Sequence, residues 1–176
     1  SSWPYPNIAT ATSAQNHCHR VNPDCQTKIK DFLGFKCLIV DKENTASAKD
    51  FWQHTGLGLS SREAAIALGK EAKPSIEDGQ KARNELCNRL ANLYDCERNL
   101  VHIHRSGMAA LTTTLNAIRE IRGNRRILQV GFPYVDVLKL PQVIYQGSDL
   151  LVETSLAQIK RELEESNPAA LIIEIP

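Results

Sequence analysis

Hydrophobic positions along the chain follow two different periods, which predict alternating strands and helices. Short, mostly apolar runs predict strands at 35–40, 99–104, 126–130, 142–145 and 169–176. Amphipathic stretches that follow capping residues predict helices at 45–53, 61–68, 75–93, 106–122 and 155–165. Within the third of these helices, Leu86, Leu90 and Leu93 recur at helical spacing and are predicted to face a core. Strands that alternate with helices imply a mostly parallel sheet covered by helices, so the sequence predicts an α/β fold.

The N-terminal part of the chain is predicted to be less regular. Residues 1–24 are polar and contain three prolines, which predicts an extended arm that packs on another surface, such as a second subunit. A short helix is predicted at 25–33, ended by Gly34. The chain also ends on a predicted core strand. Because domains seldom stop there, we expect this chain to be a piece of a longer protein.

Composition narrows the classes of protein to consider. The 176 residues are 42% hydrophobic, which is enough for a domain with a core, and the net charge of +1 gives no basic field for nucleic acid. No apolar run approaches the roughly 20 residues that span a bilayer, and no cleavable signal pattern opens the chain. Five cysteines without a C-x-x-C pair indicate reduced thiols, so we expect a cytoplasmic protein.

A metal site near the N-terminus is the first candidate for chemistry. His17, Cys18, His19 and Cys25 are ligand-type residues, but they lack a second closely spaced ligand pair. We therefore expect no metal site.

The stretch 100–117 carries the strongest chemical signal. A predicted strand leads through Ser106 and Gly107 into a predicted helix. The first amides of a helix lack partners within it and attract anions, Gly107 lets a phosphate approach the backbone, and the Ser106 hydroxyl can bind the same anion. The pattern also fits an ordinary turn between a strand and a helix, with a serine cap.

Two other loops carry candidate binding residues. Ser61 and Arg62 begin a predicted helix after a glycine-containing loop, which suits contact with an anion; a capped surface turn with a solvated arginine is the alternative. Tyr134 lies in the predicted loop 131–137, at the carboxyl end of a strand, where ligands bind in open α/β sheets. It could stack on a planar ligand or simply pack beneath the loop.

Four segments resemble one enzyme family in order and spacing. The run Ser106-Gly107-Met108-Ala109-Ala110 is similar to the phosphate-binding turn of the Cys/Met-metabolism enzymes that use pyridoxal 5′-phosphate, such as cystathionine γ-synthase, cystathionine lyases and homoserine-ester sulfhydrylases. The segments 60–62, 134–140 and 171–176 resemble the family's Tyr-Ser-Arg, its Tyr-Gly-Gly-Thr-x-Arg-Leu and the strand before its Ser-Asn-Pro. The run 52–56 looks most like the divergent fungal-type cystathionine γ-synthases.

The resemblance covers about residues 35–176 and implies a fold and a function. The fold would be the N-terminal part of the large domain of fold-type I (aspartate-aminotransferase-like) transferases, preceded by an arm. On this basis the chain divides into an arm with a short helix (1–34), a small β-α unit with a helical segment and the subunit-contact loop (35–98), and the first part of the cofactor-binding domain (99–176). The implied activity is γ-replacement or γ-elimination on an activated homoserine or a related sulfur amino acid, in methionine and cysteine metabolism.

The resemblance also assigns residues to roles. The cofactor phosphate would be held by Ser106, Gly107 and Met108, the pyridine ring would stack on Tyr134, and Ser61 and Arg62 would reach the phosphate of a neighbouring subunit. This arrangement implies a homo-oligomer, a dimer or tetramer, with a shared active site.

The sequence departs from the family in several places. Ser60 replaces a tyrosine that contacts phosphate, and 135–137 replace Gly-Gly-Thr. The family's Schiff-base lysine, the aspartate that pairs with the pyridine nitrogen and the arginine that binds the substrate carboxylate all lie beyond position 176. The catalytic residues are therefore unknown, and we do not expect this segment alone to be competent.

Two other functions remain open on the sequence. The chain could be a non-catalytic or degenerate relative that binds a partner subunit. It could also be a nucleotide-binding α/β domain that uses the Ser106–Gly107 turn. That function predicts an acidic residue at the end of the next strand to bind ribose, and Gln129, Val130 and Gly131 offer none.

Overall fold

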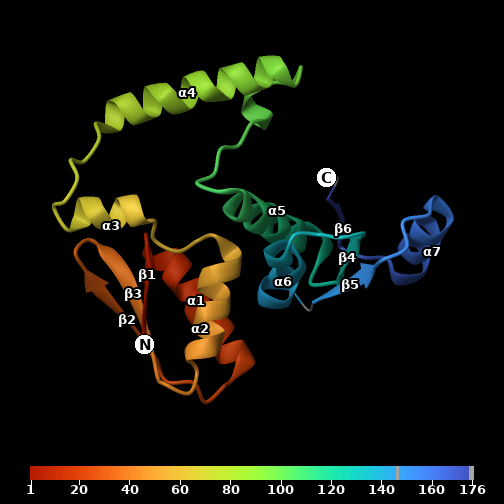
Figure 1. The fold of residues 1–176 in the computed structure, drawn as a ribbon, viewed down its shortest axis with the longest axis horizontal. Coiled ribbons are helices and arrows are strands. Elements are labelled where there is room, and N and C mark those ends of the chain that lie inside the picture. The colour runs from red at the N-terminus through yellow and green to blue at the C-terminus, as the bar shows by residue number, and fades with distance from the viewer. Residues whose placement is uncertain (146, 175–176) are drawn as a thin grey trace.

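The computed structural model describes residues 1–145 and 147–174, and it has the α/β class that the sequence predicts. Along the chain (Figure 1) the elements are β1 (Ser2–Tyr5), α1 (Ile8–Val21), β2 (Thr27–Phe32), β3 (Phe35–Val40), α2 (Thr45–Thr55), α3 (Ser61–Ala67), α4 (Ile76–Leu93), the 3₁₀ helix η1 (Arg98–Leu100), α5 (Gly107–Arg122), β4 (Ile127–Val130), α6 (Val135–Ile144), β5 (Ser148–Leu151), α7 (Leu156–Ser166) and β6 (Ala170–Ile173). The five helices predicted from caps and apolar spacing are confirmed to within a few residues.

The prediction of an extended arm at 1–24 is wrong. This segment forms β1 and the 14-residue helix α1, which buries Ala11, Ala14 and Cys18 on one face. The three prolines that suggested an arm lie before and after the helix rather than inside it. Asn7 starts the helix, since its side chain accepts a hydrogen bond from the Thr10 amide at 2.9 Å.

The helix predicted at 25–33 is also wrong, because this segment is a strand in a hairpin. β2 pairs antiparallel with β3, and β1 pairs with the other edge of β3, which gives a sheet with the order β1-β3-β2. Leu33 and Gly34 form the two-residue turn, with φ of 49° and 85°. Both values are positive, as in the turns that match the twist of a hairpin. Gly34 therefore serves a hairpin rather than a helix end.

A second, parallel sheet has the order β5-β4-β6. Its central strand β4 is buried along its whole length. The strand predicted at 142–145 is wrong. Residues 142–144 belong to α6 and Tyr145 is its C-cap, whereas the next strand, β5, begins at Ser148. Their β-branched and aromatic residues favour a strand locally, but burial of Val143, Ile144 and Tyr145 in the core decides the outcome.

The strand predicted at 99–104 is absent from the described residues: η1 is followed by an irregular segment. Two of its carbonyl groups bond to side chains of α4 instead of to a neighbouring strand. Arg83 donates to the Ile103 carbonyl at 2.9 Å, and the Cys87 thiol lies 3.8 Å from the Val101 carbonyl.

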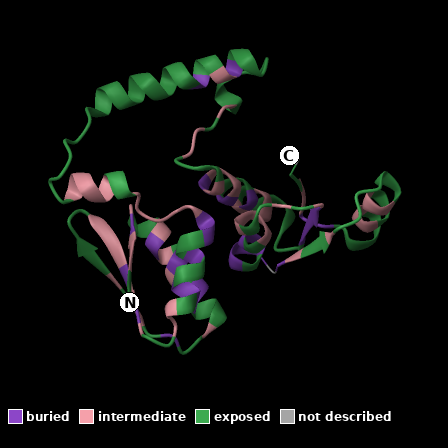
Figure 2. Cartoon of the chain, viewed as in Figure 1, coloured by how far each residue is buried: buried purple, intermediate pink, exposed green. Residues whose placement is uncertain are grey.

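One hydrophobic core joins the two sheets. Tyr5 and Phe51 from the N-terminal part contribute to the same buried cluster as Leu115, Ile127 and Leu140. In contrast, α4 lies apart from this body in Figure 1 and is almost entirely exposed in Figure 2. The prediction of a core-facing leucine stripe on α4 is wrong for this chain.

The exposed fractions on α4 show the difference. Leu86 and Leu93 are 46% and 73% exposed, whereas Cys87 and Ala91 are buried. The buried face of α4 is therefore small, and it packs against η1.

Candidate functional site

The N-terminus of α5 is open to solvent and carries free donors. Ser106 is the N-cap in extended conformation, and its hydroxyl accepts a hydrogen bond from the Ala109 amide at 3.1 Å. The amides of Gly107 and Met108 donate to no group within the described part of the chain. A Cβ placed on Gly107 would meet no atom within 4 Å. This end of the helix can therefore receive an anion against its backbone.

The last turn of α2 packs directly against that helix start. Gly56 follows α2 with φ of 65°, and a Cβ placed on it would lie 2.7 Å from both the Ser106 hydroxyl oxygen and the Ala109 nitrogen. The Thr112 hydroxyl donates to the Thr55 carbonyl at 2.9 Å. Because only glycine fits at position 56, the end of α2 fixes the position of the serine cap.

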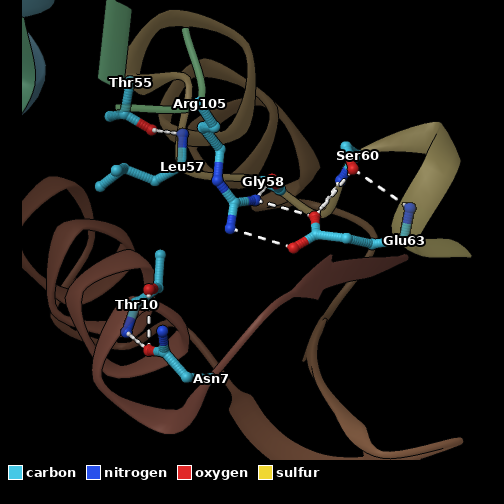
Figure 3. A network of polar contacts seen from close by, with 8 residues as sticks. All are labelled: Asn7, Thr10, Thr55, Leu57, Gly58, Ser60, Glu63 and Arg105. Atoms are coloured by element: carbon cyan, nitrogen blue, oxygen red, sulfur yellow. Dashed lines mark hydrogen bonds and ion pairs between the residues drawn. The ribbon is translucent and has the colours of Figure 1, made fainter. Parts of the chain in front are cut away.

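Arg105, immediately before the cap, joins α5 to the start of α3. Its guanidinium donates to the Gly58 carbonyl at 2.9 Å and to the Glu63 carboxylate at 3.0 and 3.2 Å (Figure 3). Ser60 and Glu63 also form a reciprocal capping box at the start of α3. Partial burial works against the Glu63 carboxylate, but hydrogen bonds from Ser60 and the charge of Arg105 outweigh it and lower its pKa.

Ser61 and Arg62 are exposed in the first turn of α3. They line a surface hollow of about 730 Å³ together with Arg105. Within the described residues, no hydrogen bond or ion pair joins Arg62 to Ser106, Gly107 or Met108. The chain therefore presents Arg62 outward, on the same side of the molecule as Arg105.

Tyr134 is the N-cap residue of α6, so the loop predicted at 131–137 is shorter than expected. Its backbone amide donates to the Glu174 carboxylate at 2.6 Å, which ties the start of α6 to the residue after β6. Its side chain is 55% exposed. The pKa of the Tyr134 hydroxyl is raised because the hydroxyl donates a hydrogen bond to the Asp136 carboxylate. The ring is thus available for a ligand at the carboxyl end of the parallel sheet.

Asp136 also binds a buried histidine of α2. Its carboxylate lies 2.7 Å from Nδ1 of His54, a side chain that is almost fully buried. The last turn of α2 therefore contacts both candidate segments: His54 holds the start of α6, and Gly56 packs on the start of α5. Sequence reasoning missed these two contacts of the last turn of α2. Gly56 carried a signal as a helix-ending glycine, but nothing in one sequence pairs His54 with a residue 82 positions away.

The ligand-type residues of α1 are engaged elsewhere. Nδ1 of His17 contacts the Val143 carbonyl at 3.2 Å, and Nε2 of His19 contacts the Thr27 hydroxyl at 2.8 Å. Among the described residues, no three His, Cys, Asp or Glu side chains gather as a metal site requires. All five cysteines are free thiols.

No helix in the described ranges combines the length and the apolar character needed to cross a membrane. In comparisons with known proteins, no family model matches the chain, and neither a curated protein nor a solved structure matches it.

Proposed function

We propose that the chain is the N-terminal part of a pyridoxal-phosphate-dependent transsulfuration enzyme of the cystathionine γ-synthase type. One observation carries the proposal: the start of α5 presents two unpartnered amides, at Gly107 and Met108, beside the Ser106 hydroxyl. A dianionic phosphate needs several convergent donors and a favourable dipole, and an open helix N-terminus supplies both.

The surrounding residues fit the other parts of the cofactor. Tyr134 offers an exposed ring at the start of α6, after the carboxyl end of β4. Stacking on such a ring contributes roughly 0.5–1.5 kcal/mol beyond the area that it buries. Arg62 offers a guanidinium without an internal partner in the described residues, as a contact with a neighbouring subunit requires.

In this role the chain binds and orients rather than reacts. Bound pyridoxal phosphate supplies an electron sink for carbanions at Cα and Cβ of an amino-acid substrate. Ser106, Gly107 and Met108 hold the phosphate, and Tyr134 sets the plane of the ring. The last turn of α2 supports both segments, since His54 contacts the start of α6 and Gly56 packs on the start of α5.

Cofactor affinity of the full-length protein tests the proposal with a matched pair of serines. Ser106 and Ser155 are both N-caps that accept a hydrogen bond from the amide three residues ahead, at 3.1 and 3.3 Å. Ser106→Ala and Ser155→Ala should each cost about 1 kcal/mol of folding stability. Only Ser106→Ala should also weaken pyridoxal phosphate binding, by about tenfold if one charge-assisted hydrogen bond is lost.

The measurement is a titration of the apoprotein with pyridoxal phosphate, followed by its absorption spectrum. Equal cofactor affinities in the two variants would contradict the role of Ser106. A full-length protein that binds no pyridoxal phosphate would overturn the proposal.

A partner-binding role without catalysis is the second candidate, and the surface of α4 favours it. Leu93 and Tyr94 at the end of this helix are 73% and 72% exposed, and Ile76 at its start is 80% exposed. Exposed apolar side chains of this size on one projecting helix are typical of a surface that another chain covers. A stable complex that forms through α4 without cofactor would support this second function.

A further inference from the structure

A polar cavity of about 140 Å³ lies between α1, α5 and the end of α6. Its polar lining includes Ser13, Asn16, His17, Arg20, Asn116 and Arg119. None of the described side chains that line it is a carboxylate. The cavity therefore offers donors and positive charge, with Phe51 and Leu57 as an apolar wall.

The two arginines meet at the carboxyl end of α6. Arg20 donates to the Val143 carbonyl and Arg119 to the Ile144 carbonyl. Partial burial lowers the pKa of Arg20, and the charge of the nearby Arg119 lowers it further. Two cations from α1 and α5 are thus held side by side by backbone contacts.

The positive charge at this point is only partly balanced. The end of a helix carries about half a negative charge, against two full positive charges on the guanidinium groups. Within residues 1–145 and 147–174, neither Arg20 nor Arg119 has a carboxylate at ion-pair distance, whereas Arg89, Arg105 and Arg126 each have one. Each guanidinium has five N–H donors and uses few of them here, so several remain for a ligand.

The buried histidine in the wall adds a further constraint. Nδ1 of His17 lies 2.9 Å from Nη2 of Arg20 and 3.2 Å from the Val143 carbonyl oxygen, so both side chains lie against this end of α6. Burial, and then the charge of Arg20, lower the pKa of His17 against smaller opposing effects of the Val143 carbonyl and Asp50.

We propose that this cavity is a binding site for a small oxyanion, held by Arg20 and Arg119 and lined by Asn16 and Asn116. An oxyanion with two or more acceptor oxygens, such as a phosphate or the carboxylate of a small metabolite, suits paired guanidinium groups. The site is separate from the start of α5 and does not depend on the function proposed above.

Calorimetric titration of the full-length protein with inorganic phosphate tests the proposal. Chloride at equal ionic strength serves as the reference anion. We expect phosphate to bind and chloride not to. Arg20→Met and Arg119→Met should each lower phosphate affinity by about tenfold or more, as expected for loss of a charge-assisted contact. Arg89→Met, which removes an exposed arginine of α4, should leave it unchanged.

Further variants separate the possible outcomes. Arg119 bonds to the backbone of α6, so Arg119→Met also removes a structural contact. Asn116→Leu is a second test, because it fills the cavity and leaves both arginine contacts intact. Asn116→Leu should also abolish phosphate binding. Ser106→Ala should not affect the binding of phosphate at this site. If phosphate affinity falls in Ser106→Ala and not in the arginine variants, the anion binds at α5 and the proposal is overturned. Equal responses to phosphate and chloride would overturn it as well. Acetate in place of phosphate distinguishes a carboxylate ligand from a phosphate ligand.

Discussion

At the scale of single residues, the neighbours of a glycine matter as much as its backbone conformation. Gly56 and Gly69 have nearly the same left-handed φ, 65° and 69°. A Cβ on Gly69 would meet nothing within 4 Å, whereas on Gly56 it would collide with the start of α5. The two positions therefore separate the cost of a strained backbone from the cost of a collision.

Gly56→Ala should destabilise the protein more than Gly69→Ala. Placing alanine in the left-handed region costs about 1–2 kcal/mol at either position. The collision at Gly56 adds roughly 1–3 kcal/mol, the usual cost of overpacking. Urea denaturation of the two variants measures the difference in the free energy of unfolding. Equal losses would show that α2 and α5 can separate freely.

Asp136→Asn should lower the pKa of the Tyr134 hydroxyl. The folded protein raises this pKa above the ordinary value of about 10, because the neutral phenol donates to the carboxylate. The hydrogen bond therefore stabilises the fold below that pH and is lost as the pH rises through the raised pKa. NMR titration of labelled tyrosine, assigned with Tyr134→Phe, measures the shift.

Asp50→Asn is the matched control for this prediction. Asp50 lies 4.0 Å from the other nitrogen of His54 and is not in contact with Tyr134. An unchanged titration of Tyr134 in Asp136→Asn, or an equal change in Asp50→Asn, would argue against the hydrogen bond.

Residue roles that depend on local chemistry could be predicted from the sequence. Ser106 is the cap of α5, as its place before an apolar run suggests, because capping involves residues three apart. The pairs His54 with Asp136 and Arg105 with Glu63 join residues far apart in the chain. Only the fold brings them together, so the sequence contained no pattern for them.

At the scale of elements, helices were predicted better than strands, for a physical reason. Caps and apolar spacing define a helix within its own residues, and the bounds of α2, α4, α5 and α7 follow them closely. A strand needs a partner that the local sequence does not show. Residues 25–33 became a strand because β3 lies beside them, and 99–104 did not because α4 takes their carbonyl groups.

Gly79→Ala should strengthen α4. Gly79 lies inside this helix, has no atom within 4 Å of an added Cβ and does not have positive φ. Alanine there should favour the helix by about 0.5–1 kcal/mol. Because α4 contacts mainly η1, the gain should appear as slower hydrogen exchange of α4 amides, with exchange in α5 unchanged. Faster exchange in α4 would contradict the prediction.

At the scale of the whole molecule, the proposed function gives Arg62 a role between subunits. If the proposed function holds, Arg62→Ala in the full-length protein should weaken cofactor binding, because it would remove a guanidinium contact to phosphate. If this contact crosses between subunits, mixing Arg62→Ala protein with Tyr134→Ala protein should restore activity. Each mixed dimer then contains one site with both side chains intact.

Arg62→Ala protein mixed with itself is the control, and it should stay at its own low activity. Absence of recovery in the mixed sample would indicate that Arg62 serves its own chain, or no phosphate at all.

The isolation of α4 from the rest of the molecule has a consequence for proteolysis. Residues 68–75, which lead into this helix, are all exposed, and such segments are the preferred sites of nicking. Trypsin should cut after Lys70 rather than Lys73, since Pro74 follows the latter. The two fragments should nevertheless elute together from a gel-filtration column, because Tyr5 and Phe51 share a core with Leu115 and Leu140. They should separate only in denaturant, because the shared core holds the two fragments together after a single cut.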